Sequence, residues 1–191
     1  MKENKRYQAI EIDAQGNPIP GTETILWNSR SAAVTCVLLS MAENSKDIKF
    51  LVEKRGPGCP DNIGKYVFPC GYLGWDETLQ EAVIREVYEE TGIKLAKDMI
   101  SEPISIQDSP EANRQNITVR FLAYLPTETI EQGLKDGTIN CKTEERGGEP
   151  GECEELLLVT SDWVGEHKDE FAFGHDLLVN EVMGVLKNVD L

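Results

Sequence analysis

Apolar and polar positions along the chain follow two periods, which divide it into strands and helices. Residues 31–41 form a continuous apolar run, typical of a strand buried on both faces, and residues 48–55 follow it after a polar turn. Together the two segments predict a β-hairpin. Shorter runs bounded by Gly, Pro, Asn and Asp predict further strands at 6–13, 22–28, 66–69, 100–110, 114–126 and 153–163.

Helical spacing appears after a tight turn predicted at 70–76 and again near the end of the chain. Asp76 or Thr78 is placed to cap the first helix, and Gly92 is placed to end it in a left-handed conformation. Its apolar stripe consists of Leu79, Ala82, Val83 and Val87. The last helix is predicted within 174–189, with apolar positions at Leu177, Leu178, Val182 and Val185.

The order of these elements is many strands, one central helix, more strands and a final helix. Such an order favours an α+β fold with a mixed sheet flanked by helices over repeating βαβ units. A length of 191 residues predicts one domain, 1–191, with the strands of 5–28 as an appendage. Residues 127–151 begin as a short helix and continue as a flexible polar loop. This insertion is a candidate lid or the contact of a homodimer.

The charge balance limits the classes of partner. With 34 acidic and 19 basic residues the net charge is −15, which disfavours nucleic acid and anionic membranes as partners. No secretion signal or membrane-spanning run is present, so we expect a cytoplasmic protein with reduced thiols. The cysteines form no zinc-binding spacing with each other or with the two histidines; they are Cys36, Cys59, Cys70, Cys141 and Cys153.

Three glutamates gather near the C-terminal end of the central helix. Glu86 and Glu90 are four residues apart and share a face, and Glu89 flanks the same edge. Like charges at this spacing repel, and the helix dipole disfavours negative charge at this end. Bound Mg²⁺ or Mn²⁺ would reverse the balance, because both ions prefer carboxylate oxygens. A solvated acidic face and an acidic calcium-binding surface are the alternatives, although the spacing of an EF-hand is missing.

The segment 71–93 carries a longer motif. It reads G-x5-E-x7-R-E-U-x-E-E-x-G-U, where U is a bulky aliphatic residue. The nine matching positions are Gly71, Glu77, Arg85, Glu86, Val87, Glu89, Glu90, Gly92 and Ile93. In this motif the chain resembles the Nudix hydrolase family, and the resemblance implies an α/β/α sandwich with a mixed sheet. One departure is Cys70, where many relatives have a glycine; we interpret it as structural rather than as a catalytic thiol.

The resemblance also implies a reaction, the metal-dependent hydrolysis of a pyrophosphate bond in a nucleoside diphosphate linked to another group. It assigns Glu86, Glu89 and Glu90 as ligands of Mg²⁺ or Mn²⁺, together with the carbonyl of Gly71. It assigns structural roles to Glu77, Arg85, Gly71 and Gly92. The alternative is a Nudix-fold module that binds a nucleotide as a sensor without cleaving it; sensors of this kind commonly lose the glutamates that this chain keeps.

The general base and the substrate contacts lie outside the motif. Among the candidates for the base, Glu149, Glu152, Glu154 and Glu155, we favour Glu155, which precedes the apolar part of a strand. Arg55, Arg114 and Arg120 are candidates to bind a phosphate or carboxylate, with Arg55 the first choice. The aromatic residues that could stack on a base are Trp27, Trp75, Tyr66, Tyr72 and Phe171. The sequence predicts a small-molecule nucleotide substrate but does not select one.

Overall fold

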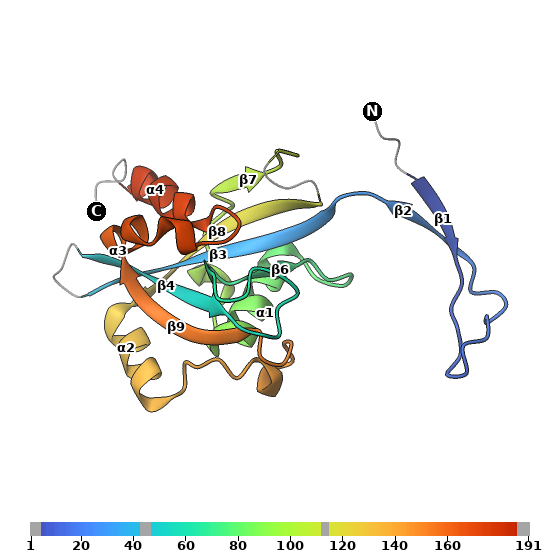
Figure 1. Ribbon diagram of the computed structural model, residues 1–191, viewed down its shortest axis with the longest axis horizontal. Helices are drawn as coiled ribbons and strands as arrows, with labels where there is room; N and C mark the ends of the chain where they lie inside the picture. Colours follow the sequence, from blue (N-terminus) through green and yellow to red (C-terminus); the bar gives the residue numbers. More distant parts are fainter. Residues whose placement is uncertain (1–4, 43–46, 112–114, 187–191) are drawn as a thin grey trace. The chain divides into compact units, whose positions relative to one another are not determined.

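The computed structural model describes residues 5–42, 47–111 and 115–186, and the side chains of 5–7, 24–28 and 185 lie outside this description. The chain forms two compact units, Met1–Ser31 and Ala32–Leu191 (Figure 1). In the first unit β1 (Lys5–Ala9) pairs antiparallel with β2 (Thr24–Asn28). The boundary between the units falls close to the end of the predicted appendage, 5–28.

The second unit is built on a seven-stranded sheet, counted over the described residues, with strand order β5-β4-β3-β8-β7. In addition, β6 pairs with β3 and β9 pairs with β4. The predicted hairpin is confirmed, because Leu38 of β3 lies opposite Leu51 of β4 in an antiparallel pair. The strands are β3 (Ser31–Met41), β4 (Ile48–Arg55), β5 (Tyr66–Val67), β6 (Cys70–Tyr72), β7 (Ser105–Gln107), β8 (Asn116–Pro126) and β9 (Cys153–Thr160).

Helices cover both faces of this sheet, as Figure 1 shows. The helices are α1 (Leu79–Thr91), α2 (Thr127–Asp136), α3 (Ser161–Glu166) and α4 (His175–Leu186), with short 3-10 turns at Lys97–Met99, Thr143–Arg146 and Lys168–Glu170. Successive side chains of a strand point to opposite faces. Leu38 of β3 therefore packs in one cluster with α1 and α2, and Val37 packs in another with α3 and α4. The predicted α/β/α sandwich is confirmed.

Helix α1 begins and ends at residues that the sequence singled out. The Thr78 hydroxyl accepts a hydrogen bond from the Glu81 N–H, and the Glu81 carboxylate accepts one from the Thr78 N–H. Gly92 ends the helix at φ 81°, a left-handed conformation that favours glycine. The predicted stripe is buried at Ala82, Val83 and Val87 and partly buried at Leu79. Burial of this stripe fixes the rotation of α1 about its axis, and therefore also the positions of Glu86, Glu89 and Glu90 at the border of the core.

Several predicted element details were wrong. The strand predicted at 6–13 ends at Ala9, and the one predicted at 100–110 covers only Ser105–Gln107. Residues 70–76 contain the strand β6, because the Cys70–Tyr72 backbone pairs with β3. The strand predicted at 153–163 ends at Thr160, whose hydroxyl caps α3 by accepting from the Trp163 N–H. In α4, Leu177 is exposed, whereas Val179 is buried beside Leu178 and Val182. The predicted apolar position at Val185 lies outside the described side chains.

The insertion 127–151 is anchored to α1 and is not simply a loose loop. Its first part is the predicted helix, α2. In its second part the Arg146 guanidinium donates from Nε to the Glu89 carbonyl at 3.1 Å and from Nη2 to the Asn140 carbonyl at 2.8 Å. The first of these bonds satisfies the Glu89 carbonyl, which the helix itself leaves unpaired near its end, and the second stays within the insertion. They also hold the following segment, including Glu149 and Glu152, close to the acidic edge.

The expectation of reduced thiols was wrong for two of the cysteines. Cys141 and Cys153 form a disulfide between the insertion and the start of β9. Their spacing in the sequence did not suggest it, because only the fold brings the two residues together. Cys36, Cys59 and Cys70 are free thiols.

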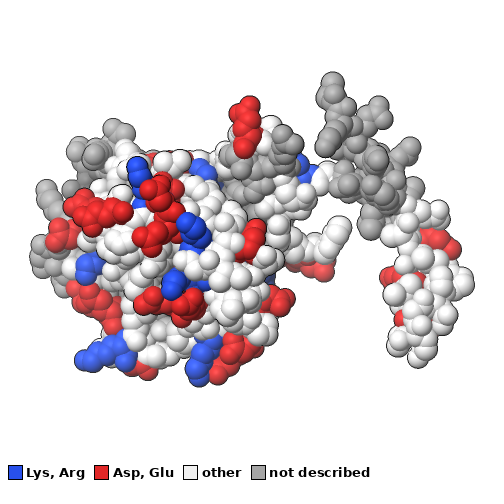
Figure 2. Space-filling model, in the orientation of Figure 1, with Lys and Arg blue, Asp and Glu red and all other residues white. Residues whose placement is uncertain are grey.

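The surface is consistent with the acidic composition. Figure 2 shows Lys and Arg side chains interspersed with Asp and Glu on the visible face, without a continuous basic patch there. Within the ranges that the structure covers, no helix has the length and apolar character needed to cross a membrane.

Candidate active site

The acidic edge of α1, formed by Glu86, Glu89 and Glu90, lies against strand β6. A Cβ atom added to Gly71 of β6 would overlap the Glu86 carboxylate. Glycine at this position is therefore what allows Glu86 to lie against the backbone of the strand. The contact gives a physical reason for the first glycine of the motif, and it brings the Gly71 backbone close to the Glu86 oxygens.

Arg85 is the only cation that directly bonds the motif's carboxylates among the described contacts. Its guanidinium donates to Glu77 through Nε at 3.0 Å and Nη2 at 2.6 Å, a bidentate pair. Its Nη1 donates to Glu86 at 2.7 Å and to Glu89 at 3.1 Å. Its Nη2 also donates to the Tyr72 carbonyl at 2.9 Å. Arg85 thus ties the turn, β6 and the acidic edge together.

Glu77 completes this support. Its carboxylate accepts a hydrogen bond from the Gly74 N–H at 2.6 Å as well as the two from Arg85. The hydrogen bonds from Arg85 hold the pKa of Glu77 below its usual value. These contacts agree with the structural roles that the sequence suggested for Glu77 and Arg85.

Glu90 is the most buried of the three acids, with 2% of its surface exposed. Its Oε2 accepts a hydrogen bond from the Cys70 N–H at 3.0 Å. Burial, and then repulsion from Glu53 and Glu86, raise the pKa of Glu90 well above its usual value. Burial and Glu90 likewise raise the pKa of the Cys70 thiol, which keeps it protonated and agrees with a structural role.

Glu53 belongs to the same cluster, and the sequence analysis did not single it out. It lies on β4 with 0% of its surface exposed. Neither carboxylate oxygen has a hydrogen-bond partner among the residues described. Burial and repulsion from Glu152 raise the pKa of Glu53 to about 8. The sequence signal was slight, because Glu53 directly follows the apolar run 50–52 and begins the charged run 53–55, which is typical of an exposed strand end.

A divalent cation fits the chemistry of this cluster. Within the described parts of the chain, no three of its acidic, histidine or cysteine side chains are already arranged around one point as ligands. Arg85 holds Glu86 and Glu89, and a backbone N–H holds Glu90. The unpartnered oxygens of buried Glu53 nevertheless require a positive charge or a donor. Hard carboxylate oxygens of this kind suit Mg²⁺ or Mn²⁺.

A cavity of about 440 Å³ opens beside the acidic cluster and includes Gly71 and Glu152 in its wall. Two of the predicted arginines, Arg55 and Arg120, also line it; Arg114 lies outside the described residues. A register shift in the β4–β9 pairing falls between Lys54 and Arg55. Such a bulge changes the direction in which the next side chain points. The Arg55 guanidinium accordingly reaches Asp61, with Nη2–Oδ1 at 3.2 Å, and the ring of Phe173, 5.2 Å from the ring centroid.

Phe173 and His175 form part of the same wall and were not predicted as site residues. Phe173 is 47% exposed at φ 57°, and Gly174 follows at φ 70°, so two consecutive left-handed residues hold the ring out of the core. His175 Nδ1 accepts a hydrogen bond from the Phe68 N–H at 2.9 Å. Burial lowers the pKa of His175 to about 3. The ring is therefore neutral and carries its proton on Nε2, as a donor on the wall of the cavity.

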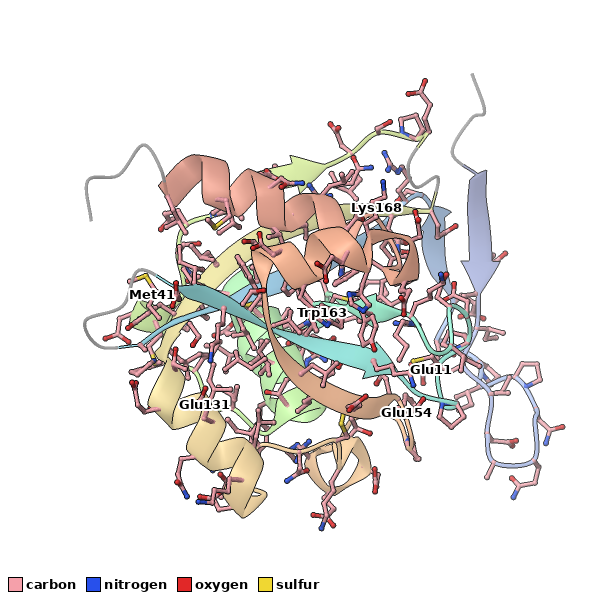
Figure 3. The ribbon with its side chains drawn as sticks, turned by 60° about the vertical axis from the view of Figure 1, so that its left-hand side comes forward. Glu11, Met41, Glu131, Glu154, Trp163 and Lys168 are labelled. Atoms are coloured by element: carbon pink, nitrogen blue, oxygen red, sulfur yellow. A yellow bond between two sulfur atoms is a disulfide. The ribbon has the colours of Figure 1, made fainter. Side chains whose placement is uncertain are left out.

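The candidates for the general base occupy different environments. Glu152 lines the cavity and is partly buried, and burial raises its pKa. Glu155, the residue favoured from the sequence, is exposed on β9 and does not line the cavity. Glu149 is exposed, and Glu154 is exposed and bonds Lys54 at 2.9 Å, as the outward position of Glu154 in Figure 3 illustrates.

The aromatic candidates are similarly divided. Tyr72 lines the cavity. Tyr66 and Phe171 pack with Trp163 between the sheet and α3, where Figure 3 places Trp163. Trp75 is almost fully exposed, and the Trp27 side chain lies outside the description. Phe173, rather than Phe171, is therefore the aromatic ring of the C-terminal part of the chain that reaches the cavity.

The metal-free protein is expected to lose stability as the pH rises. Burial raises the pKa of Glu86 to about 7, so the folded protein keeps a proton there that the unfolded chain releases above pH 4.5. Between these values the free energy of unfolding falls with rising pH, by about 3 kcal/mol from Glu86 alone. Urea unfolding in a chelator at pH 5 and pH 8 measures the change, and Glu86→Gln should reduce it. A free energy that rises over this range would contradict the prediction.

Residues 29–170 match the family model of the NUDIX domain. The chain belongs to the Nudix family. The motif at 71–93 lies inside the matched range, so the resemblance drawn from it is confirmed. No curated protein matched the sequence.

Solved structures of Nudix proteins share this fold. A MutT/nudix family protein from Enterococcus faecalis is 21% identical with a TM-score of 0.54, over 70% of this chain and 44% of that protein. The NUDIX domain of Shewanella oneidensis NrtR, in a complex with ADP ribose, is 16% identical with a TM-score of 0.60, over 83% and 90%. A C. elegans Ap4A hydrolase is 15% identical with a TM-score of 0.55, over 83% and 99%. This chain thus spans less than half of the Enterococcus protein, and at these identities the likeness establishes the fold alone.

Proposed function

We propose that this Nudix protein hydrolyses a pyrophosphate bond in a nucleoside diphosphate linked to another group, with Mg²⁺ or Mn²⁺ as cofactor. The observation that carries the proposal is the arrangement of Glu86 and Glu90 against Gly71 and Cys70 of β6, two residues that line the same cavity as Arg55. A nucleotide is the class of ligand reported with the S. oneidensis domain, and its size suits the cavity. The complete set of motif glutamates favours an enzyme over a sensor.

Glu86, Glu89 and Glu90, with the Gly71 carbonyl, would hold the cation. When bound, it would neutralise the phosphate oxygens and lower the pKa of a bound water. The residues of the chain supply the rest of the chemistry. Arg85 keeps Glu86 and Glu89 in position, and Arg55 offers a guanidinium to the phosphate or to the second group.

Glu152 is the better candidate for the general base, in place of Glu155. A base must reach the attacking water, and Glu152 lines the cavity at the side of the acidic cluster. Its raised pKa suits a group that takes a proton near neutral pH. Glu152→Gln and Glu155→Gln form a matched pair, in which only the first should lower kcat.

For Arg55, replacement by Ala is expected to raise KM by about tenfold, because a charge-assisted hydrogen bond is worth roughly 1.5–3 kcal/mol. Steady-state kinetics on the best substrate measures the effect. Arg55→Lys should recover little of it, since Lys lacks the planar fork of donors. Lys54→Ala, next along β4 and paired with exposed Glu154, is the control. An unchanged KM would remove Arg55 from the substrate contacts.

The function itself is tested by chromatographic identification of the products formed from ADP-ribose, dinucleoside polyphosphates, nucleoside triphosphates and coenzyme A, each with Mg²⁺ or Mn²⁺; ADP-ribose, for example, should give AMP and ribose 5-phosphate. Cleavage that stops on addition of a chelator is the expected result. Binding of one of these compounds without turnover would favour the sensor instead.

A further inference from the structure

Glu53 faces α1, which follows from the geometry of the strand. Leu51 belongs to the same core cluster as Ala82, Val83 and Val87 of α1. Alternate residues of a strand point to the same face, so Glu53, two residues after Leu51, points to that face as well. The electrostatic influence of Glu53 on the buried Glu90 carboxylate agrees with this direction.

The described surroundings of Glu53 offer it no hydrogen bond, and the Arg55 charge compensates it only in part. Both of its oxygens are buried, and no described residue donates a hydrogen bond to either of them or accepts one. Arg55 is close in sequence, but the register shift after Lys54 directs its guanidinium to Asp61 and Phe173. An unpaired buried carboxylate is costly whether it is charged or protonated, because either form leaves polar atoms unsatisfied.

The cost is larger because other acids share the site. Glu90 has one N–H donor, and Glu86 and Glu152 also act on Glu53 electrostatically. Such a group is retained where a ligand supplies the missing charge. Glu53 thus lies on the face of the sheet that packs against α1, close enough to Glu86 and Glu90 for the charges to influence one another.

We propose that Glu53 is a further carboxylate of the cation site, contributed by β4 opposite the acids of α1. This inference rests on the proposed function, because it assumes that the acidic edge of α1 binds a divalent cation. It goes beyond the motif, since Glu53 lies outside residues 71–93.

The test measures Mn²⁺ binding without any substrate. Mn²⁺ titrations followed by electron paramagnetic resonance give the affinity and the number of bound ions for the wild type, Glu53→Gln and Glu53→Met. Both variants should bind at least one Mn²⁺ about 10–100-fold more weakly, the range typical when a supporting group of a metal site is lost. Glu154→Gln, an exposed change on the adjacent strand β9, should bind as the wild type does.

Thermal unfolding in a chelator separates this role from a structural one. Glu53→Gln and Glu53→Met should unfold at the same or a higher temperature than the wild type without metal, and should gain less from added Mn²⁺. Variants that bind Mn²⁺ as tightly as the wild type would overturn the inference alone. Variants that fail to fold in the chelator would also overturn it, because the carboxylate would then serve the metal-free fold. A wild type that binds no Mn²⁺ would overturn the proposed function as well.

Discussion

Replacing Glu90 by Gln is expected to lower kcat by about 1000-fold while the protein remains folded. Losing one electrostatic group that acts on the transition state costs about 100–1000-fold, and a cation ligand belongs at the upper end of this range. The change keeps the shape of the side chain and an acceptor for the Cys70 N–H. It also removes a buried like charge from beside Glu53, so the free energy of unfolding in a chelator should not fall.

The measurement is single-turnover cleavage of the best substrate at saturating Mg²⁺, with circular dichroism to follow unfolding. Glu81→Gln provides a control on the same helix, because Gln at this position can maintain the capping interaction with Thr78. Its kcat should stay within about twofold of the wild type, a difference of about 0.4 kcal/mol. If Glu90→Gln retained wild-type turnover, Glu90 would not be a ligand of the catalytic cation.

Among the substitutions, replacing Arg85 by Ala should produce the largest change in stability. The guanidinium bonds Glu77, Glu86, Glu89 and the Tyr72 carbonyl, and its loss leaves three partly buried carboxylates without a counter-charge. Removal of one partner from a buried ion pair costs about 3–5 kcal/mol. Because 35% of the Arg85 side chain is exposed, solvent screening reduces the expected loss to about 2 kcal/mol.

Urea unfolding with a chelator and with Mg²⁺ checks this prediction. Mg²⁺ should restore part of the loss, since a bound cation replaces the charge beside Glu86 and Glu89. Lys97→Ala removes an exposed ion pair with Glu81 and should leave the free energy of unfolding almost unchanged, because solvent screens such pairs. An unfolding midpoint of Arg85→Ala equal to that of the wild type would contradict a central structural role for the guanidinium.

Together these variants separate the residues that support the site from the residues proposed to bind the cation. Glu77 and Arg85 hold the turn, β6 and α1 in register, whereas Glu86 and Glu90 are the proposed ligands of the cation. The disulfide and Arg146 hold the segment that carries Glu152 against the same edge. The proposed site therefore depends on contacts from the central helix, the sheet and the insertion.

Local patterns were sufficient for the hairpin, the central helix with its caps, and the acidic motif. Each depends on residues close together in the chain, such as Thr78 with Glu81, or Glu86 with Glu90, so spacing alone defines them. The Nudix fold followed from the same motif. The error at Leu177 arose because apolar spacing does not say which side of a short helix the sheet will cover.

Only the tertiary structure decided which distant residues share the site. Glu53 faces α1 because its strand packs there, and Arg55 enters the cavity after a register shift that no local pattern predicts. The two left-handed residues before α4 direct Phe173 to the cavity, while the fold brings Cys141 to Cys153. The physical reason is common to all of these residues. Their neighbours come from elements far away in the chain, so their charge, burial and direction are set by packing rather than by local sequence.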